Sequence, residues 1–255
     1  MLGMTPGLQA APARWFDELD STNAEARRLA ELGEGGPVWI AARRQTAGRG
    51  RRGRAWESAP GNLAATLLAV TELAPAEAAQ LSFVTALAVA DLACAYVPDA
   101  LVGFKWPNDV LVQGAKASGI LIESGPQSNG GLWLAIGVGV NLVQAPADLP
   151  YPATTLAAHL RPGAAAPTPD EALTRLIALM AARVDQWRGE GFSAVRRAWL
   201  DRAIGMGAAC TARLGDGAAL QGVAEGLDID GALLLRMDDG QVRRIAAGDV
   251  FFGSP

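Results

Sequence analysis

The sequence predicts an α+β protein in which a large mixed domain precedes a small all-β domain. Its 255 residues exceed the roughly 150 that are typical of one domain. Before residue 204, β-like and helical segments follow one another, whereas short alternating segments beyond Gly205 are separated by Asp-Gly pairs. Asp-Gly favours tight hairpin turns, so this part predicts a small antiparallel barrel. We expect a leader over 1–13, a main domain over 14–203 and a C-terminal domain over 204–255.

Four helices are expected in the main domain. They cover residues 20–33, 75–97, 169–191 and 192–204. In the first, Thr22 and Glu25 have the spacing of a capping box, and Gly33 is a natural stop. The second is apolar on nearly every face, which predicts burial against a sheet. Pro169 fits the start of the third helix.

Short apolar segments bounded by turn residues indicate the strands of this domain. They cover residues 37–45, 62–71, 101–109, 110–113, 118–124 and 132–142, with connections at 114–117 and 127–131. Pro107 has no N–H to donate to a neighbouring strand, so its segment is expected to end at a sheet edge or bulge. Asn108 and Asp109 then fit a turn.

Composition and charge exclude several classes of protein. The formal net charge is −4, the wrong sign for a protein that coats nucleic acid. No apolar run reaches the roughly eighteen residues of a membrane-spanning helix, and no signal peptide is present, so a cytoplasmic protein is expected. Cys94 and Cys210 lack the spacing of a disulfide framework or zinc site. His159 is the single histidine; multi-histidine metal sites are excluded, and we interpret it as part of a helix end or loop.

The strongest local feature is the arginine- and glycine-rich segment 43–56. Between Arg43 and Arg54 lie six arginines, three glycines and no acid, a local charge of about +6. Arginine side chains and glycine amides suit phosphate and carboxylate ligands, although the Walker pattern is absent. A solvated loop or an RNA-binding tract is the alternative. The position between two strands, directly before Trp56, favours a lid over a small anionic ligand.

Two lysines lie close together in a chain whose other 20 basic residues are arginines. Lys105 begins the segment KWPND, and Lys116 follows eleven residues later. Asp109 either forms a surface ion pair or holds Mg²⁺ while the lysines neutralise a transferring group, and the residues alone leave both options open. In GVGVN, residues 137–141, the glycines suggest close approach of a ligand, and Asn141 offers an amide for base recognition.

Six motifs follow one another along the chain: DSTN, QTAGRGRRGRAW, SAPGNL, KWPND, KASGILIE and GVGVN. Together they resemble the biotin protein ligases, the biotin–[acetyl-CoA-carboxylase] ligases. GALLLRM and AAGDVFF extend the resemblance over residues 15–252. It implies the class II synthetase-like biotin/lipoyl ligase fold, a mixed, largely antiparallel sheet flanked by helices, with a small C-terminal SH3-like β-barrel.

The resemblance also implies a two-step reaction that uses biotin, ATP and Mg²⁺, without a structural metal. Biotin is activated to biotinyl-5′-AMP with release of pyrophosphate, then transferred to a lysine of a biotin carboxyl carrier protein of acetyl-CoA carboxylase or a related carboxylase. The enzyme is expected as a monomer or homodimer without DNA or membrane partners. About fourteen residues precede the matching region, too few for the DNA-binding module of some relatives, so no repressor function is expected.

The functional residues of the family carry over to matching positions of this chain. The catalytic residues implied are Lys116, Arg51 and Lys105. Biotin binding is implied for Ser21, Thr22, Asn23, Gln45, Arg49, Gly50, Arg51, Lys116 and Gly119. ATP or adenylate binding is implied for Arg49, Arg51, Arg54, Trp56, Lys105, Asn108, Asp109 and Asn141, with Asp109 also at the metal. Helix capping is the alternative role of Ser21 and Thr22, and Trp56 is expected to pack the end of the closed loop.

The sequence leaves two other functions open. A lipoate ligase or octanoyl transferase would share the fold, but relatives of that kind carry a histidine-bearing motif that His159 does not match. A non-enzymatic nucleic-acid binder would use GRGRRGR, residues 48–54, although the rest of the chain is acidic.

Overall fold

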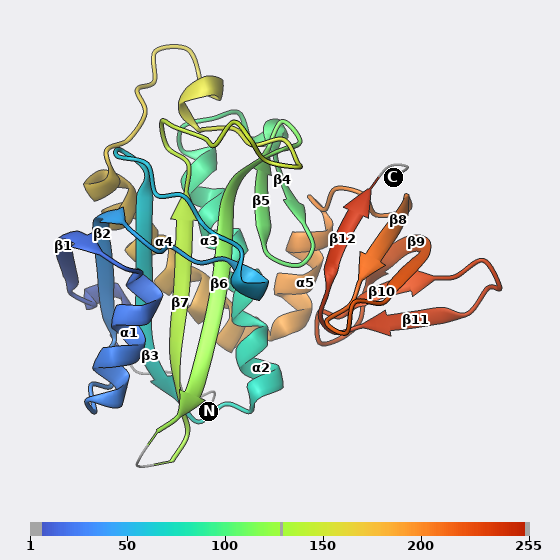
Figure 1. The fold of residues 1–255 in the computed structure, drawn as a ribbon, viewed down its shortest axis with the longest axis horizontal. Coiled ribbons are helices and arrows are strands. Elements are labelled where there is room, and N and C mark those ends of the chain that lie inside the picture. Colours follow the sequence, from blue (N-terminus) through green and yellow to red (C-terminus); the bar gives the residue numbers. More distant parts are fainter. Residues whose placement is uncertain (1–6, 128–129, 253–255) are drawn as a thin grey trace.

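The computed structural model describes residues 7–127 and 130–252, and within them the main domain is built on one seven-stranded sheet (Figure 1). Its strand order is β1-β2-β3-β7-β6-β5-β4. The strands are β1 Ala13–Leu19, β2 Val38–Gln45, β3 Leu63–Thr71, β4 Val102–Lys105, β5 Asp109–Val112, β6 Ala115–Pro126 and β7 Leu132–Val140. β1 pairs in parallel with β2, and the other neighbours pair antiparallel. The expected mixed, largely antiparallel sheet is therefore confirmed.

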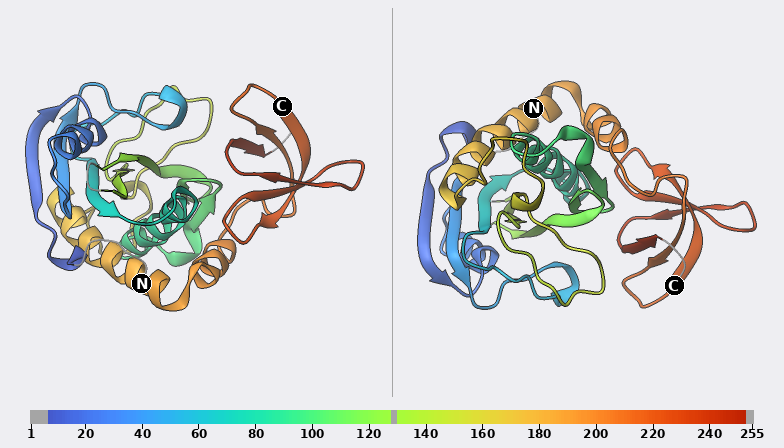
Figure 2. Two further views of the ribbon diagram at one scale, coloured as in Figure 1. Left: turned by 90° about the horizontal axis from the view of Figure 1, so that it is seen from below. Right: turned by 90° about the horizontal axis from the view of Figure 1, so that it is seen from above.

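Helices cover both faces of this sheet (Figure 2). They are α1 Thr22–Glu31, α2 Pro75–Ala79, α3 Leu81–Cys94, α4 Pro169–Glu190 and α5 Phe192–Leu200. On one face, Ala26 and Ala30 of α1 pack with Ile40 and Leu68 of the sheet. On the other face, α3 and α4 contribute most of their buried side chains to the main core. The first residues of α1, Thr22 and Asn23, thereby lie against Thr66 in the middle of β3.

The segment Pro75–Cys94 is long and apolar enough to cross a membrane by length and composition alone. About two thirds of it is buried inside the protein, and eleven residues of α3 are buried. Its apolar character is explained by this position between the sheet and α4, as expected for a helix that is apolar on nearly every face.

The C-terminal residues form a second, five-stranded antiparallel sheet in the order β11-β10-β9-β8-β12. Its strands are β8 Ala209–Arg213, β9 Ala219–Leu227, β10 Leu233–Arg236, β11 Val242–Ile245 and β12 Asp249–Phe252. All three Asp-Gly pairs lie at turns between these strands, as predicted. The sheet is consistent with an SH3-like domain, but β11 and β12 do not pair within the described residues, so closure into a barrel is not observed.

Several local expectations were wrong. Ser21, not Thr22, is the N-cap of α1, and the Ser21 side chain makes no capping hydrogen bond. The Thr22 hydroxyl is instead engaged with side chains of the sheet. The strand expected over 101–109 is interrupted because Trp106, Pro107 and Asn108 form the turn between β4 and β5.

Other boundaries differ less. The helix expected over 75–97 is divided between α2 and α3, the one over 192–204 ends at Leu200, and β1 was not predicted. β4 lies at the edge of the large sheet, as Pro107 indicated. Residues 1–6 of the expected leader, 128–129 of the turn at 127–131 and 253–255 of the C-terminal domain lie outside the described residues.

Candidate active site

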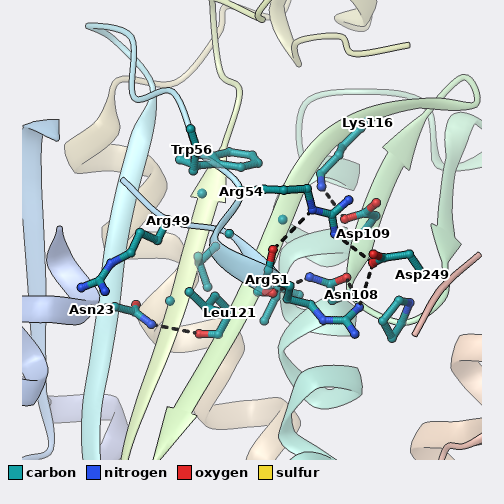
Figure 3. A pocket seen from close by; sticks show the side chains of 18 of the residues that line it. Asn23, Arg49, Arg51, Arg54, Trp56, Asn108, Asp109, Lys116, Leu121 and Asp249 are labelled. Carbon is teal, nitrogen blue, oxygen red and sulfur yellow. Dashed lines mark hydrogen bonds and ion pairs between the residues drawn. The ribbon is translucent and has the colours of Figure 1, made fainter. Parts of the chain in front are cut away.

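A cleft beside the start of α1 collects most residues that the sequence assigned to the site (Figure 3). It encloses about 900 Å³, part of it open to solvent. Fourteen assigned residues line it: Ser21, Thr22, Asn23, Gln45, Arg49, Gly50, Arg51, Arg54, Trp56, Lys105, Asn108, Asp109, Lys116 and Gly119. Asn141 does not line it. The cleft has two chemically different ends, which we call the polar end and the cationic end.

The polar end is lined by uncharged side chains at the start of α1 and the end of β2. The backbone N–H of Thr22 donates to Gln45 Oε1 at 2.8 Å, and the Thr22 hydroxyl lies 3.1 Å from the same oxygen. Gln45 Nε2 donates to Ser58 Oγ at 2.7 Å. Thr22 is buried, as is Thr66, whose hydroxyl lies 2.8 Å from that of Thr22. Internal hydrogen bonds therefore fix the side chains at this end.

The arginine-rich segment folds over the cleft as a short hairpin. Gly50 N–H donates to Arg54 O at 2.7 Å, and Trp56 N–H donates to Gly48 O at 2.9 Å. A Cβ on Gly48 would overlap the carbonyl oxygen of Trp56, so this close crossing requires glycine. In this structure the segment folds back on itself beside the cleft, and we call it the lid.

The C-terminal sheet holds this lid. Asp249, at the start of β12, lies 2.8 Å from Arg54, 3.2 Å from Arg52 and 3.7 Å from Arg51. Arg51 also donates to Gly248 O at 2.9 Å. Asp249 itself lines the cleft, so the second domain forms part of the site.

Arg51 lies at the centre of the cationic end, where Arg54, Asn108, Asp109, Lys116 and Asp249 gather (Figure 3). Its guanidinium donates to Asn108 Oδ1 at 3.3 Å, and Asn108 is oriented by its own bond to Ile120 O at 2.6 Å. Burial lowers the pKa of the Arg51 guanidinium, and Asp249 opposes this effect. A further anion at this end would likewise favour the charged form of Arg51, so the positive charge of Arg51 favours binding of an anion there.

The two lysines lie at this end, where Lys116 is ion-paired with Asp109. Lys116 Nζ lies 2.6 Å from Asp109 Oδ1, and the same ammonium is 5.7 Å from the Trp56 ring and 5.4 Å from the Tyr151 ring. The contact with Asp109 lacks hydrogen-bond alignment, so this buried oxygen has no hydrogen-bond partner. Burial lowers the pKa of Lys105, whereas Asp109 raises it.

The glycines of β6 and β7 are explained by side chains of this chain. A Cβ on Gly139 would overlap the Trp56 ring, and a Cβ on Gly137 would overlap Asn23 Oδ1. A Cβ on Gly119 would lie 3.0 Å from the Trp56 ring. The close approach predicted from GVGVN is therefore made by Trp56 and Asn23, and Trp56 packs the end of the lid as expected.

Asn141 lies outside the cleft and supports a loop that borders it. It is buried, and its Nδ2 donates to Thr154 O at 3.1 Å. Thr154 N–H in turn donates to Lys116 O at 2.9 Å, which fixes the loop carrying Tyr151 against β6. His159 Nε2 lies 2.8 Å from Thr154 Oγ1 at the end of a short 3₁₀ turn, as its loop interpretation implied.

Sequence reasoning did not assign every residue of the site, and three polar side chains are among those it missed. Tyr151 and Asp249 line the cleft, and Ser58 holds Gln45. Asp249 and Ser58 belong to the motifs AAGDVFF and SAPGNL, which carried the resemblance, whereas no motif included Tyr151.

A resident metal centre is not indicated in the described part of the chain. No group of three or more His, Cys, Asp or Glu side chains there is arranged to hold a metal ion. Asp109 offers one carboxylate beside an ammonium group, which suits an ion brought in by a phosphate substrate more than an ion held by protein ligands alone.

Comparisons with known proteins identify the class to which this fold and cleft belong. The model described as "Biotin/lipoate A/B protein ligase family" matches residues 15–141, and the model described as "Biotin protein ligase C terminal domain" matches residues 206–253. The class is thus that of ligases acting with biotin or lipoate. Within it, the chain belongs to the biotin protein ligase family and is an enzyme.

Individual relatives agree with this assignment. The chain is 43% identical to the biotin–[acetyl-CoA-carboxylase] ligase of Paracoccus denitrificans, over 92% of this chain and 98% of that protein. It is 35% identical to the ligase of the same name from Mycobacterium tuberculosis, over 90% and 85%. The structure of the Aquifex aeolicus biotin protein ligase in complex with biotin and ATP superimposes with a TM-score of 0.75, at 27% identity, over 96% and 99% of the two chains.

Proposed function

We propose that the enzyme activates biotin with ATP to biotinyl-5′-AMP and transfers biotin to a lysine of a biotin carboxyl carrier protein. The observation that carries this proposal is a single cleft that joins a neutral hydrogen-bonding end to a cationic end. A neutral cyclic urea fits the first, and the carboxylate and the phosphates fit the second. The Aquifex relative, which holds biotin and ATP together, supports both substrates.

In the first step, a biotin carboxylate oxygen attacks the α-phosphorus of ATP, and the bond to the bridging oxygen breaks as pyrophosphate leaves. Both reactants are anions, so their approach requires fixed positive charge. Lys116, Arg51 and Lys105 supply this charge, and Arg54 adds to it. Arg49 and Gly50 of the lid line the path of the acyl chain, and Gly119 leaves room beside Lys116.

In the second step, the amine of the carrier lysine attacks the acyl carbon, loses a proton, and AMP leaves as the carbon–oxygen bond breaks. The lid excludes water from the mixed anhydride, which would otherwise hydrolyse. We assign the ureido ring to Ser21, Thr22, Asn23 and Gln45. Trp56 and Asn108 are assigned to the adenylate. Asn141 is assigned to the adenine, and we propose that it acts there indirectly, through the loop that it holds.

Mg²⁺ belongs with ATP in this proposal. Magnesium typically keeps several waters and is bound through one or two carboxylates and the substrate phosphates. Asp109, which lines the cleft and whose Oδ1 is ion-paired with Lys116, supplies such a carboxylate. When bound, the ion neutralises the charge that develops on the leaving pyrophosphate.

The test is exchange of labelled pyrophosphate into ATP. Exchange is expected to depend on biotin, to be absent with lipoate, and to be unaffected by added RNA. Lipoate-dependent exchange would instead assign the enzyme to the other branch of the class. Absence of exchange together with tight RNA binding would favour the nucleic-acid binder.

The remaining features of the proposal concern domains and partners. We assign the catalytic domain to residues 14–203 and the SH3-like domain to 204–255, and we place the enzyme in the cytoplasm as a monomer or homodimer. We also propose that it lacks repressor function. Support comes from the Paracoccus relative, which is named only as a ligase. Sequence-specific operator binding in a mobility-shift assay would contradict this.

A further inference from the structure

A chain of hydrogen bonds connects a carboxylate on β6 to the polar end of the cleft. Asn23 Nδ2 donates to Glu123 Oε2 at 2.8 Å and to Leu121 O at 3.3 Å (Figure 3 shows the latter). Asn23 Oδ1 lies 2.7 Å from Thr66 Oγ1, which lies 2.8 Å from Thr22 Oγ1. Glu123 is half-buried, whereas Asn23, Thr66 and Thr22 are buried.

The protons along this chain can have one arrangement. Glu123 and the Leu121 carbonyl only accept hydrogen bonds, so they require the NH₂ group of Asn23 to face them. Asn23 Oδ1 must then accept, and the donor that the described residues offer is the Thr66 hydroxyl. Because a hydroxyl has one proton, Thr66 presents a lone pair to Thr22.

The consequence falls on Thr22. Its single proton is directed to Thr66 or to Gln45 Oε1, which are both groups of the protein. Toward the cleft the Thr22 hydroxyl therefore offers only lone pairs. Gln45 is fixed as a donor toward the cleft. Its Oε1 accepts the Thr22 backbone N–H, and one N–H of its Nε2 donates to Ser58. Its second N–H is left for a ligand.

We infer that Glu123 is a positioning and specificity-determining residue that acts through Asn23 and Thr66 to make Thr22 an obligate acceptor. The inference rests on the proposed function, in which the ligand head is a cyclic urea. A cyclic urea offers ring N–H donors beside a C=O acceptor, which is the complement of Thr22 and Gln45. A head group with a ring oxygen in place of N–H would face Thr22 with lone pairs on both sides.

The inference is tested by the selectivity of pyrophosphate exchange between biotin and its two cyclic carbamate analogues, in each of which one ring N–H is replaced by oxygen. Thr66→Val removes the middle hydroxyl of the chain, and Glu123→Ala leaves only the Leu121 carbonyl to orient Asn23, so in both variants the Thr22 hydroxyl is freer to turn and donate. We expect the KM for biotin to rise about tenfold, and selectivity against one carbamate to fall by a similar factor, as for one lost hydrogen bond. The KM for ATP should not change.

Conservative variants separate positioning from folding. Thr66→Ser keeps the hydroxyl and should restore both the KM for biotin and the selectivity. Glu123→Gln keeps an acceptor oxygen but can also turn its amide, so an intermediate loss of selectivity is expected. These two variants carry the test if Thr66→Val or Glu123→Ala fails to fold. Glu31→Gln, which removes an exposed carboxylate of α1, is the matched control and should match the wild type.

The possible outcomes distinguish the two proposals. A wild-type protein without biotin-dependent exchange would overturn the proposed function, and this inference with it. The inference alone would be overturned if the wild-type protein exchanges with biotin while Thr66→Val and Glu123→Gln keep the wild-type KM for biotin and the wild-type selectivity against both carbamates. A Thr66→Ser variant that loses selectivity although it keeps the hydroxyl would overturn it as well.

Discussion

The two ends of the cleft differ in the interactions that they offer to a ligand. At the polar end, Thr22, Gln45 and Ser58 bond to one another, and their neighbours all belong to the main domain. At the cationic end, charged side chains from the lid, β5, β6 and the C-terminal sheet meet around Asp109 and Asp249. A neutral head group is recognised by the direction of hydrogen bonds, which requires fixed partners. Anionic groups are recognised by charge, which tolerates parts from two domains but depends on their docking.

The largest effect is expected for Lys116→Arg at the cationic end. Guanidinium keeps the charge, but its wide planar head does not fit the space between Asp109, Trp56 and Tyr151. We expect adenylate formation to slow about 100-fold, as for the loss of one aligned donor, with the KM for biotin little changed. Single-turnover formation of biotinyl-5′-AMP measures this. Arg27→Lys, the reverse exchange on the exposed face of α1, is the control, and near-normal adenylation by Lys116→Arg would refute its role.

A smaller effect is expected where the lid meets the C-terminal sheet. Arg51→Ala removes the contacts with Asn108 and Gly248, so release of bound adenylate should speed up about 30-fold, equivalent to about 2 kcal/mol. Carrier recognition should change less. Arg52→Ala is the matched control, because Arg52 contacts Asp249 without lining the cleft. Equal adenylate retention by wild type and Arg51→Ala would show that the lid does not hold the intermediate.

Two glycines of β7 allow the ends to be perturbed separately by the same substitution. Gly137→Ala pushes against Asn23, and Gly139→Ala pushes against Trp56. The first should raise the KM for biotin about tenfold and the second the KM for ATP by a similar factor, since small misplacements are costly in such sites. Steady-state exchange kinetics with each substrate varied in turn provide the measurement. A rise in the same KM for both variants would mean that the ends are not independent.

The smallest effect is expected for Asp20, the residue directly before Ser21 in the chain. The hydrogen bond from Arg28 lowers the pKa of Asp20 to about 2. Since the folded-state pKa is depressed, the stabilisation is complete above the unfolded pKa and is lost as pH falls through about 2. The pair is about half exposed, so Asp20→Asn should cost less than about 1 kcal/mol at neutral pH. Urea unfolding at pH 7 and pH 2 measures it; an undiminished difference at pH 2 would contradict this origin.

Much of the site was predictable because chemistry and local geometry were written into contiguous motifs. The arginine-rich segment implied an anion-binding lid, KWPND marked an edge turn, and GVGVN marked a close approach. What approaches those glycines was not predictable, since Trp56 and Asn23 are about a hundred residues away in the chain. The capping box failed for the same reason: Thr22 finds better partners in Gln45 and Thr66 than in its own helix.

The sequence by itself determined the family, the excess of positive charge in one short segment, and the residue types available for binding. Tertiary structure decided which of these residues act together. It brought Asp249 to arginines that lie some 200 residues earlier, Glu123 to Asn23, and it kept Asn141 outside the cleft. Motifs record chemical identity, whereas ion pairs and hydrogen-bond direction depend on distances and proton positions that exist only once the strands have paired and the two sheets have docked.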